Sequence, residues 1–149
     1  MEAVGNISIA TVIDLKSDWY VNESSSDFIA YCFHSVDGFS KVGSYTGNGS
    51  SDGTFVYTGF RPAFVMIKNT DNARNWHIKD TQRDPYNFME RYLNANDNAT
   101  EGSGVSTVYV DYLSNGFKMR GTSTTINESG STHIYIAFAE NPFKNTNAR

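Results

Sequence analysis

Short runs of β-branched and aromatic residues, separated by loops rich in Gly, Asn, Ser and Asp, dominate this chain. Runs of this kind, bounded by turn residues, are typical of β-strands. The run Ala63–Lys68 is apolar on both faces apart from its final Lys, which predicts a central strand, and Pro62 fits the first strand position. The pattern as a whole predicts strands at Ile7–Ile13, Phe28–Phe33, Phe55–Phe60, Ala63–Lys68, Trp76–Lys79, Val105–Leu113, Phe117–Arg120 and His133–Glu140.

Two connections between these strands have specific signals. Asn115-Gly116 lies between apolar runs and predicts a β-hairpin with a type I′ turn, because both residue types tolerate positive φ. The spacing Gly59-Phe60-x-Pro62-x-x-Val65 predicts a bend between two strands. In this arrangement Gly59 and Pro62 turn the chain, and Phe60 and Val65 fill the core on either side of the corner.

Helical signals are few. Pro85–Asn94 has helix-like spacing, with Asp84 as a cap, and predicts either one short helix or a turn. The 149 residues hold three Leu, whereas ten Phe and nine Tyr raise the aromatic share to 14%. Aromatic residues favour the half-buried face of a sheet, and Leu favours helices. The sequence therefore predicts an all-β fold, an antiparallel β-sandwich of jelly-roll type with at most one short helix.

A segment near the N-terminus is repeated near the C-terminus. Asn22–Phe33 aligns with Asn127–Phe138, and each copy runs from Asn-Glu-Ser into an aromatic, β-branched stretch. Repetition predicts that residues 1–40 are the closing strands of one unit, packed on a β-sandwich formed by residues 41–149. On this interpretation Cys32 is a buried small hydrophobe. Convergence of two similar strands is the alternative.

Composition excludes several classes of function. A net charge of −4 makes nucleic acid an unsuitable partner, because phosphate binding requires clustered Lys and Arg. A single cysteine excludes an intrachain disulfide framework and a zinc site built from several cysteines. No apolar run reaches the ~20 residues of a membrane span, so membrane insertion is not expected.

Catalytic and metal-binding patterns are also weak. The chain carries no hydrolase, zinc-protease, Walker or dinucleotide-binding motif, and each of its three His lies in or beside a predicted strand. Asp80, Asp84 and Glu90 could form the carboxylate pair of a glycosidase, but Asp84 precedes Pro85 as a cap would. Asn94–Asn98 has too few carboxylates for a calcium loop. We expect no enzyme activity, no metal and no cofactor.

Binding to a carbohydrate or a surface is a better candidate. Aromatic side chains beside polar residues suit stacking on sugars. Four aromatic residues are the candidate surface contacts, although Trp76 alternates with Ile78 and is expected to face the core: Trp19, Tyr20, Trp76 and Tyr86.

Several longer motifs carry a family resemblance over roughly residues 28–145. They are Tyr31–Gly49, Thr58–Lys68, Arg83–Asn87, Ser114–Lys118 and Ile136–Phe143. In these motifs the chain resembles a domain of structural proteins of marine bacteriophages, cyanophages included, often found at the C-terminal end of tail-fibre or adhesin-like proteins. The resemblance implies a virion location and implies no catalytic residue. It leaves open whether the chain is a small self-standing virion protein or a piece of a longer one.

The resemblance and the residues together give the functional expectation. The chain is expected to be a tail-fibre or appendage domain for host-surface recognition or assembly. Its expected partners are other virion proteins, host glycan and copies of itself, most simply as a homotrimer, because several strands are apolar on both faces. The alternatives are a capsid decoration or spike protein without a receptor role and, less favoured, a glycan depolymerase.

Overall fold

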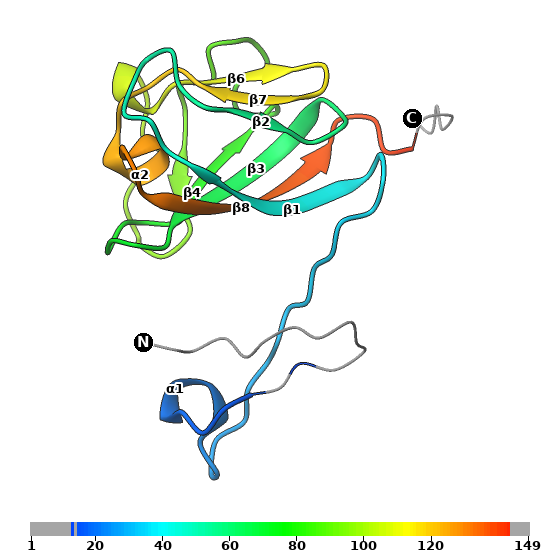
Figure 1. Cartoon of the computed structure of the whole chain (residues 1–149), viewed down its shortest axis with the longest axis vertical. Helices are drawn as coiled ribbons and strands as arrows, with labels where there is room; N and C mark the ends of the chain where they lie inside the picture. The colour runs from blue at the N-terminus through cyan, green and yellow to red at the C-terminus, as the bar shows by residue number, and fades with distance from the viewer. Residues whose placement is uncertain (1–12, 14, 144–149) are drawn as a thin grey trace. The chain divides into compact units, whose positions relative to one another are not determined.

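The computed structural model describes residues 13 and 15–143 and divides the chain into two units, with the boundary after Cys32 (Figure 1). The described part of the first unit contains one helical turn, α1 (Trp19–Asn22). The second unit begins at Phe33, so residues 33–40 belong with the sandwich rather than with the N-terminal segment. The strand expected at Ile7–Ile13 lies, except for Ile13, outside the described residues.

The second unit is a sandwich of two antiparallel sheets, which confirms the all-β prediction (Figure 1). One sheet has five strands in the order β1-β8-β3-β4-β5, and the other has three in the order β2-β7-β6. The last strand, β8, therefore lies between the first and the third. The strands are β1 (Ser40–Thr46), β2 (Phe55–Tyr57), β3 (Pro62–Asn69), β4 (His77–Asp80), β5 (Leu93–Asn94), β6 (Val110–Leu113), β7 (Gly116–Met119) and β8 (Thr132–Ala139).

The core lies between the two sheets. Side chains alternate along each strand, so one face of β3 contributes Val65 and Ile67 to the core, and β8 contributes Tyr135 and Ala137. The smaller sheet supplies buried side chains from all three of its strands: Val56, Val110, Tyr112, Phe117 and Met119. These apolar contacts are the main stabilising interaction of the unit.

The opposite face of the five-stranded sheet is also apolar. Val42 on β1 pairs with Ile136 on β8, which pairs with Met66 on β3, which pairs with Ile78 on β4. These four residues form a row across the sheet on the side away from the β2-β7-β6 sheet, and we call them the outer-face row. Next to this row, four phenylalanine rings pack on one another: Phe138 contacts Phe33, Phe39 and Phe64.

Both predicted connections exist, one of them with different turn geometry. The β6-β7 hairpin closes with Leu113 paired to Gly116, so its loop is Ser114-Asn115 and not Asn115-Gly116. Among the described non-glycine residues, positive φ occurs only at Phe143, so the turn is not type I′. Gly116 is instead needed for a close approach, because a Cβ there would lie 2.1 Å from the backbone oxygen of Val56.

The corner before β3 has the predicted form. Gly59 has φ +86°, Pro62 is the first residue of β3, and Phe60 and Val65 are both in the core. β3 itself is the middle strand of its sheet, as its apolar faces indicated.

Two other expectations were wrong. Phe28–Phe33 forms no strand: Ile29 and Tyr31 are each more than 80% exposed, and Cys32 is exposed rather than buried. Without a neighbouring strand, its apolar pattern has no sheet face to cover. For Pro85–Asn94, where the sequence predicted a short helix or a turn, the structure has no helix: Met89 bridges to Val110 and Tyr92 bridges to Gly102. The described residues contain two one-turn α-helices, α1 and α2 (Thr124–Asn127), and a 3-10 turn, η1 (Ser106–Val108).

Asn127, at the end of α2, joins the turn before β8 to the loop after β1 by hydrogen bonds. Its side chain is fully buried. The amide oxygen accepts from the Asn48 backbone N–H at 2.9 Å, and the amide nitrogen donates to the backbone oxygens of Ser50 and Gly121 at 2.8 and 2.9 Å. Its own carbonyl accepts from Gly49 N at 2.8 Å. A buried amide with all these partners ties three chain segments together.

We expect Asn127→Ala to lower the free energy of unfolding by about 3 kcal/mol, because it leaves buried backbone groups without partners. Urea denaturation measures the change. Asn98→Ala, at an exposed asparagine, is the matched control and should cost well under ~1 kcal/mol. Equal losses in the two variants would contradict the anchoring role.

Candidate functional site

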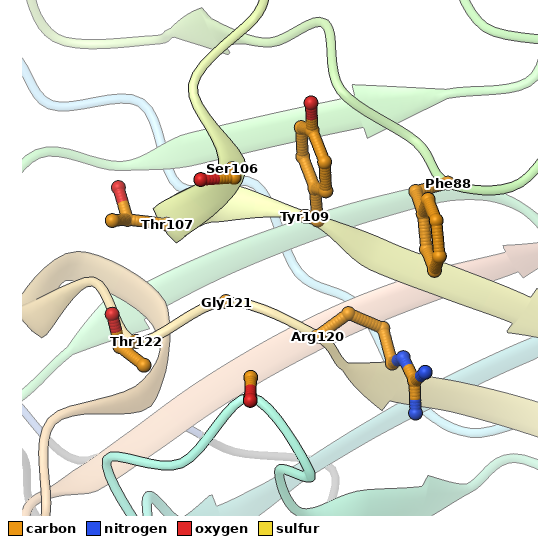
Figure 2. Close-up of a pocket in the computed structure, with 8 residues that line it drawn as sticks. Phe88, Ser106, Thr107, Tyr109, Arg120, Gly121 and Thr122 are labelled. Atoms are coloured by element: carbon orange, nitrogen blue, oxygen red, sulfur yellow. The ribbon is translucent and has the colours of Figure 1, made fainter.

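A pocket of about 260 Å³ opens where loops from both sheets meet (Figure 2). Its residues come from the loop after β1, the loop between β4 and β5, the 3-10 turn η1 with the start of β6, and the segment that follows β7. The lining consists of Ser51, Phe88, Ser106, Thr107, Tyr109, Arg120, Gly121 and Thr122.

Two stacked rings form one wall of the pocket. Phe88 and Tyr109 have ring centroids 5.6 Å apart and an interplanar angle of 10°. Arg120 extends toward Phe88, with its guanidinium carbon 5.7 Å from the ring centroid (Figure 2). Phe88 is half exposed, so its ring remains available to a ligand. A planar apolar wall beside a guanidinium offers stacking and hydrogen bonding in one place.

Carboxylates hold the guanidinium in position. Arg120 Nε lies 3.4 Å from Asp111 Oδ2, and Arg120 NH1 lies 3.9 Å from Asp52 Oδ1. Asp52 also accepts from Lys118 Nζ at 2.5 Å. This hydrogen bond with Lys118, together with the charges of Lys118 and Arg120, lowers the pKa of Asp52. Arg120 is thus flanked by two carboxylates and keeps further N–H groups for a ligand.

The far side of the pocket is hydroxyl-rich. Figure 2 shows Ser106, Thr107 and Thr122 along this side, away from the aromatic wall. The backbone here is tightly packed, because Ser123 N donates to Thr107 O at 2.8 Å and a Cβ at Gly121 would lie 1.9 Å from the same oxygen. Hydroxyl groups both donate and accept, so this side can match the hydroxyl groups of a neutral polar ligand.

The side chains that line the pocket are hydroxyl, aromatic and guanidinium groups. None of the described residues that line the pocket is a His, a Cys or a carboxylate. His and carboxylate side chains are the common general bases, and a Ser or Thr hydroxyl acts as a nucleophile when such a base activates it. No group of three His, Cys, Asp or Glu side chains in the described part of the chain is placed to hold a metal ion. Nor does any described helix have the length and hydrophobicity to cross a bilayer.

The four aromatic residues chosen from the sequence do not form this site. Trp19 and Tyr20 contact each other in the N-terminal unit, with ring centroids 4.3 Å apart. Tyr86 is 80% exposed and does not line the pocket. Trp76 is half-buried and lies outside the core cluster, because the core side of β4 carries His77 and Lys79.

None of the residues that line the pocket was predicted from the sequence, including the three that form its aromatic wall and its guanidinium: Phe88, Tyr109 and Arg120. They come from three separate segments, and no motif or spacing connects them. Of these three, only Phe88 lies in a segment that the sequence had marked, the helix-like spacing of Pro85–Asn94. Its exposure follows from the bridge that Met89 makes to Val110.

The acidic residues near this region have structural roles. Asp80 accepts from the backbone N–H and the side chain of Arg83, and Asp84 accepts from the backbone N–H groups of Glu90 and Arg91. Glu90 receives a 3.5 Å contact from the Tyr109 hydroxyl. These contacts fix the loop that presents Phe88.

The asparagine-rich loop is likewise fixed by hydrogen bonds. Asp97 accepts from Asn75 and Asn94, and the Asn96 side chain accepts from Trp76 N at 2.7 Å. The loop is therefore joined to the segment before β4. This is a structural role for its oxygen-bearing side chains.

A second polar cluster lies on the buried face of β4 in the larger sheet, where His77 and Lys79 are shielded from solvent. His77 stacks on Tyr92 with ring centroids 4.4 Å apart, and Lys79 Nζ donates to the backbone oxygens of Met89 and Arg91 at 2.8 and 3.1 Å. Burial lowers the pKa of Lys79 to about 8. Burial and the nearby charge of Lys79 lower the pKa of His77 to about 3.

The buried histidine predicts acid sensitivity. Because the folded pKa of His77 lies below its usual 6.5, its contribution to stability is complete above that pH and is lost as pH falls toward about 3. At about pH 5 the loss amounts to about 2 kcal/mol. His77→Phe keeps the stacking on Tyr92 and should weaken this pH dependence, measured by urea unfolding at neutral pH and at about pH 5. His34→Gln, at an exposed histidine, should behave like the parent protein.

Comparison with known proteins identifies a family. No curated protein and no solved structure matches the chain. The sequence profile of DUF7483, a domain of unknown function, matches residues 4–142. This match covers the N-terminal segment, every strand of the sandwich and the pocket. The chain therefore belongs to the DUF7483 family.

Proposed function

We propose that this chain is a structural domain of a bacteriophage virion appendage that recognises a host surface glycan through the Phe88–Tyr109–Arg120 pocket. The phage assignment depends on the resemblance carried by motifs such as Tyr31–Gly49 and Ile136–Phe143. The glycan assignment depends on the pocket. It is supported by one observation: a stacked aromatic wall, an oriented guanidinium and a hydroxyl-rich side face the same cavity.

Each part of the pocket matches a feature of a sugar. The aromatic wall can cover the apolar C–H face of a pyranose ring. Arg120 and the hydroxyl side chains can bond to ring hydroxyls or to an acidic substituent. A pocket of about 260 Å³ is slightly smaller than most small-ligand sites and suits one or two sugar units of a longer chain.

Binding of purified protein to bacterial surface polysaccharides tests the proposal. Phe88→Ala should weaken binding about tenfold, because it removes the exposed ring of the stacked pair. Tyr86→Ala is the matched control, since Tyr86 is an exposed aromatic residue on the same loop that does not line the pocket. Biolayer interferometry against immobilised polysaccharides gives the affinities, and thermal unfolding checks that each variant is folded.

The outcomes separate the alternatives. Equal weakening by the two variants would place binding outside the pocket. Absence of binding by the parent protein would favour a decoration or spike protein without a receptor role. Release of reducing sugar ends would favour a depolymerase.

Self-association is the second part of the proposal. The outer-face row, Val42, Ile136, Met66 and Ile78, lies on the sheet face away from the smaller sheet. Ile134, on the same face of β8, is 39% exposed. Apolar faces of this kind are commonly covered in symmetric oligomers. Three copies around an axis would also present three glycan pockets together, which raises avidity on a repeating polysaccharide.

Light scattering at micromolar concentration should give a mass near three times 16.6 kDa. Ile134→Lys should shift the protein to the monomer, because it places a charge in the shared apolar face. Tyr57→Lys, at an exposed aromatic residue on the smaller sheet, is the control and should leave the mass unchanged. A mass of 16.6 kDa that persists on concentration would overturn the oligomer.

A further inference from the structure

The N-terminal segment reproduces the local structure that leads into β8, with a constant offset of 105 residues. α1 ends at Asn22 and α2 ends at Asn127, and each helical turn is followed by an extended glutamate. The N-cap residues are Asp18 and Ser123, and each side chain accepts from the backbone N–H two residues later, at 2.9 and 3.2 Å.

The backbone hydrogen bonds agree in the same way. Asn22 N donates to Asp18 O at 2.8 Å, and Asn127 N donates to Ser123 O at 2.8 Å. The turn that follows closes through Ser26 N to Glu23 O at 3.3 Å in one copy. In the other copy the equivalent bond, from Ser131 N to Glu128 O, is 3.1 Å. The equivalence therefore covers two successive turns and not merely a similar sequence.

The residues after these turns match the two faces of β8. In β8, His133, Tyr135 and Ala137 are buried toward the core, and Ile134, Ile136 and Phe138 point to the outer face. The equivalent inward positions of the N-terminal segment are Phe28, Ala30 and Cys32, and the equivalent outward positions are Ile29, Tyr31 and Phe33. The segment thus carries a two-sided apolar pattern that only a strand buried on both faces requires.

In the structure, the N-terminal segment with this apolar pattern is not part of a sheet. Residues 28–33 form no strand, and Phe28, Ile29 and Tyr31 are 47%, 82% and 81% exposed. Asn22 is exposed as well, whereas the side chain of its equivalent Asn127 is fully buried and bonded to three backbone groups. Glu128 accepts from Asn69 and Asn72, whereas Glu23 accepts from nearby Ser26. The segment therefore carries Asn22 and Glu23, the equivalents of the anchoring residues Asn127 and Glu128, but these two residues do not bind equivalent loops.

We infer that residues 18–33 are a second α2–β8 element that completes the five-stranded sheet of another unit of the same fold. The partner is a DUF7483 sheet that lacks its own β8, and the segment enters between the strands equivalent to β1 and β3. Asn22 then binds a loop equivalent to Gly47–Ser50, and Cys32 takes the place of Ala137, opposite the equivalents of Lys41 and Val65.

The extent of the family match agrees with such an array. The match to residues 4–142 is longer than the 105-residue offset, so it contains one complete unit together with the closing element of a neighbour. Units that share closing strands in this way form an array in which the sheet of each unit is completed by the N-terminal segment of its neighbour. This inference does not depend on the glycan proposal, because it concerns the sheet and not the pocket.

A graft within the full chain tests whether the segment can act as α2–β8. Residues 18–33 replace residues 123–138, which have the same length. The graft should retain the β-sheet circular dichroism of the parent and unfold cooperatively. A second graft carries Ala30→Tyr, which restores the ring of Tyr135 in the core, and should unfold at a higher temperature than the first.

The matched control is a graft of residues 17–32 at the same place. A shift by one residue moves every side chain to the opposite face of the strand and displaces Asn22 from the position of Asn127. This control should lose cooperative unfolding. The inference is overturned if neither graft of residues 18–33 folds, or if the shifted graft folds as well as they do.

If the graft of residues 18–33 folds, a two-unit chain tests the partner directly. It joins residues 33–122 to residues 18–143 and carries Lys41→Cys in the first unit. Oxidation should join this cysteine to Cys32, because Lys41 pairs with the position that Cys32 would occupy. Ser40→Cys in the first unit, one residue away and on the opposite face, is the control. Equal cross-linking of the two variants would overturn the placement.

Discussion

The structure depends on the insertion of its last strand between β1 and β3. β8 pairs with both neighbours over seven or more residues, and it supplies core residues on one face and outer-face residues on the other. Without β8, the residues of β1 and β3 that pair with it would have no partner strand on that side. Such a sheet is built from contacts between residues far apart in sequence. The chain therefore loses the entropy of loop closure before these contacts can stabilise the sheet.

The turn before β8 makes this insertion specific. Asn127 offers hydrogen bonds that only the loop after β1 and the backbone at Gly121 can satisfy together. Tyr45 contributes from β1 by donating to Ile126 O at 2.5 Å, and burial raises its pKa well above the usual 10.0. A shift of β8 by one residue would break these bonds and expose the core face. By the same reasoning, the repeated turn at Asn22 indicates that its partner has a loop equivalent to the one after β1.

The pocket is a by-product of how the two sheets are joined. Its aromatic wall combines a loop between strands of the larger sheet with the start of β6 in the smaller one, and its guanidinium follows β7. Met89, fully buried and bonded to Val110, connects the sheets directly beside Phe88. Phe88 and Tyr109 are therefore held by the sandwich itself, which preorganises the wall for a ligand.

The sequence alone determined the fold class, the central place of β3, the corner at Gly59–Val65 and the repeat of Asn22–Phe33, because alternation, turn residues and repetition are local signals. Short, polar or weakly alternating segments such as β1 and β5 gave no such signal. Tertiary structure decided that Phe28–Phe33 pairs with no strand in the described part of this chain, since an apolar run cannot specify whether a neighbouring strand exists. It also decided the pocket, since Phe88, Tyr109 and Arg120 meet only when both sheets are packed together, a contact that no spacing along the chain encodes.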